Sequence, residues 1–395
     1  MMTVIILETG ESAELEDSYA RRLIEQGKAI YASGGTPDRP PQGETVDLEE
    51  MDGMIARAKT MLSIVAKSGD YNPAVLSAIA ASGHADRIYD IGDEIVIPWT
   101  DYSGDDPVTY QYPFVVTHFG DVQDENDMLH RNAMWLMAKY AEPIQIPFDA
   151  AESITVNLTQ EPNAVEGWYY WGAGATGSTR TPIEVEPGDA LPTTYYAIYK
   201  TGITNKYTIN MNVILYGYNR WSKSAIRQWL NSNAAKNAGW WTSQHLGDVA
   251  PSATVTNKPG WLYGFTDEWK AIFKKAKICT AASNPADDGV IDVTYDTFFL
   301  PSLEEIYGVP EIKNAEGRYW EYWKNVTELA EPSDDANDAR KIPSIANTSG
   351  SAMNIRLRSN TLADAYYTKI LTSGGRVSND NASSSRNCQP AFVLY

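Results

Sequence analysis

The feature that most constrains how this chain can fold is a rich supply of large aromatic side chains combined with almost no cysteine. The 395 residues include 12 Trp and 24 Tyr, but only Cys279 and Cys388. The two cysteines lie far apart in unlike settings, so they can build neither a disulfide framework nor a zinc ribbon. Burial of aromatic surface must therefore stabilise the fold, and the chain is long enough for one large domain with smaller appendages.

The charge and the apolar segments restrict the partners. A formal net charge of −19 argues against an electrostatic hold on nucleic acid, because phosphate binding needs clustered Lys and Arg. The apolar run near the start has no basic flank and no cleavage site of small residues, and no later stretch reaches membrane-spanning length. We expect a soluble protein without a signal peptide or membrane insertion.

Composition and hydrophobic periodicity divide the chain into four parts. Residues 1–32 form a small N-terminal unit, and residues 33–46 form a linker whose Gly, Pro and polar residues keep the chain extended. Residues 47–85 are helical, and residues 86–395 form the main domain. Within the first unit we expect strands at Val4–Leu7 and Ala29–Tyr31, a turn at Gly10 and a helix over about residues 17–27.

The helical segment contains a seam of apolar residues at alternating steps of three and four: Leu48, Met51, Ile55, Ala58, Leu62 and Val65. This spacing places them on one helical face. The helix packs either on its own domain or in a short coiled coil that would make the chain a homotrimer. A second helix is expected to begin with Asn72 as N-cap and Pro73 at its first position, and to run to about Ser82.

The main domain alternates short strands with brief helices, which predicts an α+β fold. Strands are expected at Glu94–Pro98, Tyr112–Thr117 and Ser153–Leu158.

Three helices of this domain have clear start signals. Ser222 is expected to cap a helix with Ala225, Ile226, Trp229 and Leu230 on one face, and Thr266 to cap a helix over residues 267–277. Ser302 and Glu305 have the spacing of a capping box.

Several phrases in the main domain, taken in order and spacing, carry a resemblance to a known family. They are IYDIGDEIVIPW (88–99), IPFDAAES (146–153), GYNRWSKSAIRQWLNS (217–232), FFLPSLEEIYG (298–308), NIRLRS (354–359) and CQPAFVLY (388–395). They resemble the C-type-lectin-like domains, related to formylglycine-generating enzymes, of variable proteins diversified by retroelements in phages and bacteria. The resemblance spans about residues 88–395. It implies two short helices around small antiparallel sheets, with irregular loops ordered by buried Trp and Tyr.

In such variable proteins, a reverse transcriptase copies a template with errors at adenines and rewrites the end of the domain. Here the resemblance implies a variable region at about residues 354–395, with apparently fixed residues at Gly374, Val377, Ala382 and Pro390. Between them lie residue types that substitution at adenine can reach: Tyr366, Tyr367, Arg376, Ser378, Asn379, Asp380, Asn381, Ser383, Ser384, Ser385, Arg386 and Asn387. These twelve are the expected ligand-binding residues. The alternative is an ordinary polar hairpin, because Asn, Ser, Asp and Gly are turn formers.

The chemistry of these residues fits a binding surface, since Tyr supplies contact area at low entropy cost while Ser and Asn supply adaptable hydrogen bonds. The resemblance implies a binding protein on the virion surface of a phage or prophage, synthesised in the bacterial cytoplasm, which contacts a host-cell surface protein or glycan. Residues 4–31 resemble segments at the start of phage structural proteins and are expected to attach to other virion proteins. The alternatives are a purely structural virion protein, such as a head fibre or decoration, and a formylglycine-generating-type oxidase.

Catalytic and metal sites are not expected. The oxidase would need two copper-binding cysteines, whereas Cys388 lies in the variable stretch and Cys279 follows an amphipathic helix, so buried or incidental thiols are favoured. Glu304 and Glu305 sit at a helix start, where the dipole favours carboxylates without any acid–base role. The acidic segment 121–130, with His118 nearby, lacks calcium-loop spacing. We expect no enzymatic activity, no cofactor and no obligatory metal.

These interpretations make a prediction about burial. Trp221, Trp229 and Leu230 should lie in the core. The tail should present one solvent-facing surface formed by Tyr366, Tyr367, Ser378, Asp380, Asn381, Ser384 and Arg386.

Overall fold

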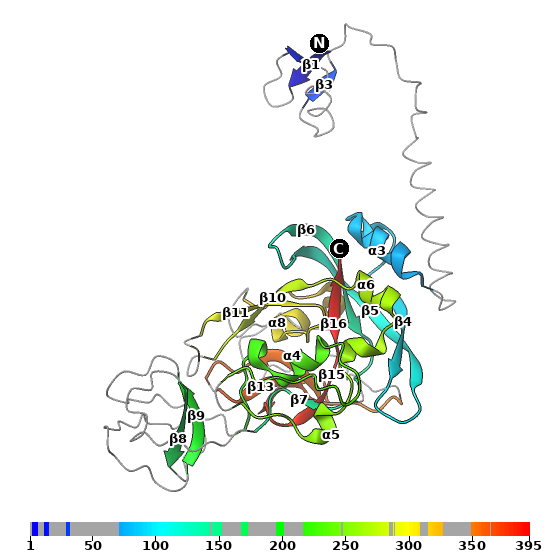
Figure 1. Cartoon of the computed structure of the whole chain (residues 1–395). Coiled ribbons are helices and arrows are strands. Elements are labelled where there is room, and N and C mark those ends of the chain that lie inside the picture. The colour runs from blue at the N-terminus through cyan, green and yellow to red at the C-terminus, as the bar shows by residue number, and fades with distance from the viewer. Residues whose placement is uncertain are drawn as a thin grey trace. The chain divides into compact units, whose positions relative to one another are not determined.

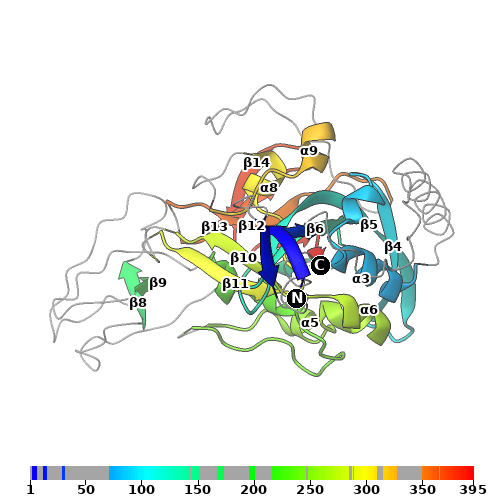
Figure 2. The same ribbon diagram turned by 90° about the horizontal axis from the view of Figure 1, so that it is seen from above.

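The fold is described from a computed structural model (Figures 1 and 2). It divides into two compact units, Met1–Arg57 and Ala58–Tyr395. The residues that the structure describes are 2–6, 12–15, 29–31, 71–142, 144–151, 167–172, 195–200, 216–245, 248–283, 287, 289–308, 315–326, 349–363 and 365–395.

The first unit contains a three-stranded antiparallel sheet in the order β2-β1-β3. Its strands are β1 (Met2–Ile6), β2 (Ser12–Leu15) and β3 (Ala29–Tyr31). The strand expected at Ala29–Tyr31 is confirmed, and the one expected at Val4–Leu7 begins and ends earlier. β2 was not expected from the sequence.

Several expected features lie outside the described residues. They are the Gly10 turn, the helix over 17–27, the linker 33–46, the apolar seam from Leu48 to Val65 and the strand at Ser153–Leu158.

The second unit is built on a four-stranded antiparallel sheet in the order β16-β6-β5-β4. Its strands are β4 (Glu94–Asp101), β5 (Val108–Gln123), β6 (Leu129–Ala138) and β16 (Ala391–Leu394). The expected strands at Glu94–Pro98 and Tyr112–Thr117 are confirmed within β4 and β5. In β4 the side chains alternate, with Ile95, Ile97 and Trp99 buried, because successive residues of a strand face opposite sides.

A second, five-stranded sheet has the order β14-β13-β12-β15-β7. Its strands are β7 (Ile146–Pro147), β12 (Ile355–Asn360), β13 (Tyr367–Leu371), β14 (Val377–Asn381) and β15 (Ser385–Cys388). In Figure 2 its strands β12 to β14 lie beside helix α8 (Leu303–Tyr307). Two antiparallel ribbons complete the described strands: β8 (Gly167–Gly172) with β9 (Tyr195–Lys200), and β10 (Ala276–Ala281) with β11 (Ile291–Asp296). Among all described strand pairs, β12 with β15 alone is parallel.

The remaining elements are short helices and 3-10 turns. They are α3 (Pro73–Ala81), η1 (Ala85–Arg87), η2 (Trp221–Lys223), α4 (Ala225–Leu230), α5 (Ala253–Thr256), η3 (Trp261–Gly264), α6 (Asp267–Ile272) and α9 (Glu321–Val326). No helix within the described residues is long and apolar enough to span a membrane. Together with the sheets described above, these helices make the second unit α+β with mostly antiparallel sheets.

Two of the expected helix starts are confirmed as predicted. The Asn72 side chain accepts hydrogen bonds from the N–H groups of Ala74 and Val75, with Pro73 at the first position of α3. Ser302 and Glu305 form the reciprocal bonds of a capping box at α8. Both signals act within one helical turn, so the sequence specifies them locally.

Two other predictions need correction. Ser224, not Ser222, is the N-cap of α4: its hydroxyl accepts from the Arg227 N–H, while Ser222 belongs to the preceding 3-10 turn η2. Thr266 does stand at the N-cap of α6, but the helix ends at Ile272 instead of continuing to residue 277. Residues 276–281 instead form β10, because pairing with β11 overrides their helical propensity.

Aromatic side chains form the centre of the second unit, as the composition predicts. Trp221, Trp229, Trp261 and Trp320 are fully buried, and Leu230 lies with them in one continuous core. Helix α3 packs on the same core through Leu76 and Ala80. The predicted core positions Trp221, Trp229 and Leu230 are confirmed.

Candidate functional site

The C-terminal tail forms one edge of the five-stranded sheet. β13 and β14 make an antiparallel hairpin in which Tyr367 lies opposite Asn381 and Leu371 opposite Val377. A turn over residues 381–384, closed by the Ser384 N–H to the Asn381 carbonyl at 3.0 Å, leads into β15. The local backbone geometry is therefore a hairpin.

Most of the predicted binding residues reach solvent. Three are exposed: Arg376, Ser378 and Asn379. Seven are half-buried: Tyr367, Asp380, Asn381, Ser383, Ser384, Ser385 and Arg386.

Tyr366 and Asn387 are buried, which corrects the prediction for both. The Tyr366 ring packs between Tyr216 and Tyr367, at centroid distances of 5.5 and 4.2 Å. The Asn387 amide donates to the Glu142 carbonyl at 2.7 Å and accepts from the Gln145 amide at 3.1 Å. Both side chains hold the sheet together and cannot reach a ligand at the surface.

Asp380 is the polar centre of the tail. Its Oδ2 lies 2.6 Å from Arg386 Nε, and its Oδ1 accepts from the Ser384 hydroxyl at 3.2 Å. Arg386, Ser384 and Asp380 therefore form one polar cluster on the surface.

A buried arginine holds the backbone of the turn that carries this cluster. Arg356, on β12, is fully buried, and its guanidinium donates to the carbonyl oxygens of Asn381 at 3.0 Å and Ser384 at 2.7 Å, and to the Thr368 hydroxyl. Burial lowers the pKa of Arg356 to about 10, so it stays charged at neutral pH. Because these bonds to the turn go to backbone carbonyls, they would survive changes of most side chains above them; the exception is Asp380, whose Oδ2 lies 3.5 Å from the Arg356 guanidinium.

Backbone bonds hold the rest of the turn in the same way. The buried Ala382 donates its N–H to the Tyr366 carbonyl at 2.8 Å, and its carbonyl accepts from the Asp149 N–H at 3.1 Å. The Ser383 N–H donates to the Tyr216 carbonyl at 2.7 Å. Gly217 has a φ of +86°, and a Cβ there would approach the Ser383 nitrogen to 2.8 Å, so only glycine fits beside the turn.

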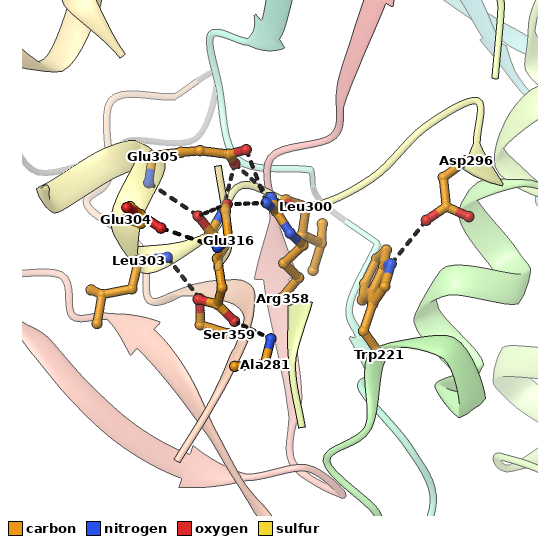
Figure 3. A network of polar contacts seen from close by, with 11 residues as sticks. Trp221, Ala281, Asp296, Leu300, Leu303, Glu304, Glu305, Glu316, Arg358 and Ser359 are labelled. Carbon is orange, nitrogen blue, oxygen red and sulfur yellow. Dashed lines mark hydrogen bonds and ion pairs between the residues drawn. The ribbon is translucent and has the colours of Figure 1, made fainter. Parts of the chain in front are cut away.

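A second buried arginine fixes β12 to α8 (Figure 3). The Arg358 guanidinium makes a bidentate ion pair with Glu305, at 2.5 and 2.9 Å, and donates to the carbonyls of Leu300 and Glu316. Burial raises the pKa of Glu316 to about 7, and its carboxylate accepts from the Ala281 N–H and the Ser359 hydroxyl. This network explains why six consecutive residues of β12 are buried although two of them are arginines.

The same network accounts for Glu304 and Glu305. The Glu304 carboxylate accepts from the Glu316 N–H at 3.0 Å, and Glu305 is committed to Arg358. Both carboxylates are buried. Their role is structural, and it extends well beyond the helix-dipole interaction that the sequence suggested.

The acidic segment 121–130 forms the turn between β5 and β6. The Asp124 carboxylate accepts from the N–H groups of Asn126 and Met128, and its other oxygen lies 3.1 Å from His130 Nε2. His118 pairs instead with Glu321. Other carboxylates of the segment pair with β10 and its surroundings, since Lys275 donates to Glu125 and Lys277 donates to Asp127.

The two cysteines occupy separate strands. Cys279 is half-buried on β10 and Cys388 is fully buried on β15, and both are free thiols. Burial raises the pKa of the Cys388 thiol well above its usual range, which disfavours the thiolate needed for metal binding or catalysis.

Glu142 lies buried behind Cys388, where its N–H donates to the Cys388 carbonyl and the Tyr112 hydroxyl donates to its carboxylate at 3.0 Å. Burial raises the pKa of Glu142 to about 8, against an ordinary value of 4.5. In the unfolded chain Glu142 ionises near pH 4.5, whereas in the fold it keeps its proton until about pH 8. Its contribution to stability is therefore complete below pH 4.5 and is lost as the pH rises through 8.

We expect the free energy of unfolding of the wild type to fall, relative to Glu142→Gln, by about 1.4 kcal/mol per pH unit between pH 5 and 8. Urea denaturation of both proteins at pH 5, 6, 7 and 8 measures this difference. Ser378→Ala, which removes an exposed hydroxyl that does not titrate, is the control and should give a pH profile parallel to the wild type. Parallel profiles for Glu142→Gln as well would contradict the assignment.

Comparison with known families gives one match. The family model described as "Domain of unknown function (DUF6273)" matches residues 196–395, about half of the chain. The chain belongs to this family. No curated protein and no solved structure matches the chain.

The DUF6273 region contains the tail and both buried arginines, but it does not contain all of its own sheet partners. β15 pairs with β7, and β16 pairs with β6, and both partners precede residue 196. In this protein the DUF6273 domain therefore folds together with residues that come before the family region.

Sequence reasoning missed the supports of the tail and a second cluster beside it, formed by Asp149, His245 and Asp248. Two signals could have pointed to them. Two arginines in the strand-like phrase NIRLRS require buried partners if that strand is internal, and His245 is one of only four histidines, with Asp248 three residues on.

Proposed function

We propose that this DUF6273 protein is a ligand-binding protein that uses its C-terminal tail as the binding surface. The observation that carries the proposal is that different groups of the tail hold its backbone and face solvent. Buried groups hold the backbone of residues 380–384, while most side chains of the hairpin and turn reach solvent. A surface built this way tolerates changes of its side chains without loss of the scaffold, as a diversified binding site requires.

The proposal includes a C-type-lectin-like fold for the domain. Short helices, small antiparallel sheets and fully buried tryptophans support it, since the resemblance implies these features. It also includes diversification by a retroelement and display on a phage particle, toward a host-surface protein or glycan. The revised binding set omits Tyr366 and Asn387 and consists of Tyr367, Arg376, Ser378, Asn379, Asp380, Asn381, Ser383, Ser384, Ser385 and Arg386.

The tail should bind through Tyr367 and Arg386, because aromatic and Arg side chains at an interface contribute most while small polar neighbours contribute little. We expect Tyr367→Ala and Arg386→Ala each to weaken binding by about 2 kcal/mol, roughly thirtyfold. The measurement is saturable binding of the purified chain to glycan arrays and to host-envelope preparations, followed by titration of the variants.

Matched controls lie on another part of the domain. Tyr110→Ala and Arg131→Ala remove an exposed Tyr and an exposed Arg of β5 and β6 and should leave binding unchanged. Full retention of the ligand after simultaneous replacement of Tyr367, Asp380 and Arg386 would overturn the proposal. Thermal melts of each variant verify that the scaffold is intact.

Diversification has its own test in the gene. We expect a near-repeat of the coding end next to a reverse-transcriptase gene, with differences confined to positions that are adenine in the repeat. Differences spread evenly over all four bases would argue against a retroelement and leave the binding surface as a separate question.

A further inference from the structure

Beside the tail, three side chains from distant parts of the chain converge. Asp149 follows β7, while His245 and Asp248 lie in the loop after α4. His245 Nε2 is 3.8 Å from Asp149 Oδ2 and 3.8 Å from Asp248 Oδ1, and one ligand atom from each residue fits within 4.8 Å of the others. The three side chains are 1%, 3% and 0% exposed for Asp149, His245 and Asp248.

This cluster places two carboxylates in a buried setting. Two carboxylates buried together are costly unless a positive charge compensates them. The nearby cation Arg220 is already engaged with Asp287 and Asp292, at 2.8 and 3.0 Å. Within the described part of the chain, no Lys or Arg forms an ion pair with Asp149.

Asp149 also has a buried carboxylate oxygen without a donor. Its Oδ2 accepts from the Tyr218 N–H at 3.0 Å, whereas its Oδ1 receives no hydrogen bond from any described residue although the side chain is buried. A buried carboxylate oxygen without a donor is uncommon in folded proteins and calls for a bound water or ion.

The distances favour a metal ion over a shared proton. A hydrogen bond between imidazole and carboxylate spans about 2.7–3.2 Å, so the 3.8 Å from His245 Nε2 to each of the two carboxylate oxygens is too long for a shared proton. Ligand atoms about 2.0–2.2 Å from a tetrahedral zinc ion stand about 3.3–3.6 Å apart, which is close to the 3.8 Å between His245 Nε2 and each carboxylate. Imidazole together with carboxylates suits divalent transition metals, whereas calcium and magnesium prefer oxygen ligands alone.

Neighbouring groups orient the ligands. The Gln244 N–H donates to Asp248 Oδ2 at 2.6 Å, which leaves Oδ1 as the oxygen on the His245 side. The His245 ring packs edge-on against Tyr218 at 5.3 Å. Such outer contacts are typical of metal sites, because they fix the orientation of the ligating groups.

We propose that Asp149, His245 and Asp248 bind one divalent transition-metal ion, for which Zn²⁺ is the probe. The three protein ligands leave a fourth position for water. The ion would fix His245 and Asp248 to Asp149, whose N–H donates to the Ala382 carbonyl of the tail turn. The sequence did not predict this site, because the acidic segment 121–130 was the candidate metal site that its pattern offered. The proposed metal site does not depend on the proposed binding function.

The test uses the full chain, stripped with chelator and titrated with Zn²⁺ against a chromophoric indicator. We expect one ion per chain, and at least a hundredfold weaker binding in His245→Gln and in Asp149→Asn. His130→Gln is the matched control, because it removes a His–Asp pair that has no third ligand, and it should bind Zn²⁺ as the wild type does. Absence of stoichiometric binding, or unchanged affinity in His245→Gln, would overturn the proposal.

A second measurement guards against variants that fail to fold. Zn²⁺ should raise the Tm of the wild type in a concentration-dependent manner, because an ion that binds only the native state stabilises it. Ca²⁺ and Mg²⁺ should leave the Tm unchanged. An equal rise with Ca²⁺, or no rise with Zn²⁺, contradicts a transition-metal site, and neither result touches the tail as a ligand surface.

Discussion

Replacing Arg358 with Met is expected to lower the free energy of unfolding by about 3–5 kcal/mol, because it leaves buried carboxylates without their cation. Arg358 is about 1% exposed and makes two hydrogen bonds to Glu305 and further ones to the carbonyls of Leu300 and Glu316. Methionine retains the apolar part of the arginine side chain but supplies no donor. Urea denaturation followed by tryptophan fluorescence measures the loss.

Two further variants separate the ion pair from general packing. The double variant Arg358→Met/Glu305→Gln should recover part of the lost stability, since it removes the uncompensated charge along with its partner. Lys139→Met, which breaks the exposed ion pair with Glu94, should cost no more than about 1 kcal/mol. A loss for Arg358→Met no greater than that of Lys139→Met would show that the network does not stabilise the fold as described.

Trp229→Ala is expected to cost about 3–5 kcal/mol, as other large-to-small changes in a core do. The Trp229 ring is completely buried, packs against Trp261 at 5.6 Å, and donates its Nε1–H to the Pro259 carbonyl at 3.0 Å. Alanine would leave a cavity and an unsatisfied carbonyl.

The contrast with the tail makes the prediction specific. Ser378→Ala, at an exposed position of β14, should change stability by no more than about 0.5 kcal/mol. If Ser378→Ala destabilised the protein as much as Trp229→Ala, the division between a rigid core and a substitutable surface would be wrong, and with it the argument for a variable binding face. Both variants are compared by chemical denaturation under identical conditions.

The predictions for the tail were correct where exposure follows from residue type and wrong where a contact from a distant segment intervened. Tyr366 directly precedes β13, which begins at Tyr367, so the alternation of side chains along a strand does not decide which of these two adjacent tyrosines is buried. The sequence contains no signal that selects Tyr366, because its neighbour Tyr216 comes from a separate segment. Asn387 is buried for a similar reason, through bonds to Glu142 and Gln145.

The helices follow the same rule. Ser302 with Glu305, and Asn72 with Pro73, were found because their partners lie within one turn. The end of α6 was missed because residues 276–281 pair with β11, a contact that helical propensity does not encode.

By itself, the sequence determined that the chain folds around aromatic side chains, that the main domain is α+β, and that most of the residues expected to bind a ligand reach solvent. These properties depend on composition, on periodicity and on contacts within a few residues. Only the tertiary structure decided which residues of the tail are buried, that Arg356 holds the turn at 381–384 while Arg358 joins β12 to α8, and that Asp149 meets His245 and Asp248. These contacts depend on how distant segments pack against each other. The free energy of that packing is a property of the whole fold, so a local sequence pattern does not predict it.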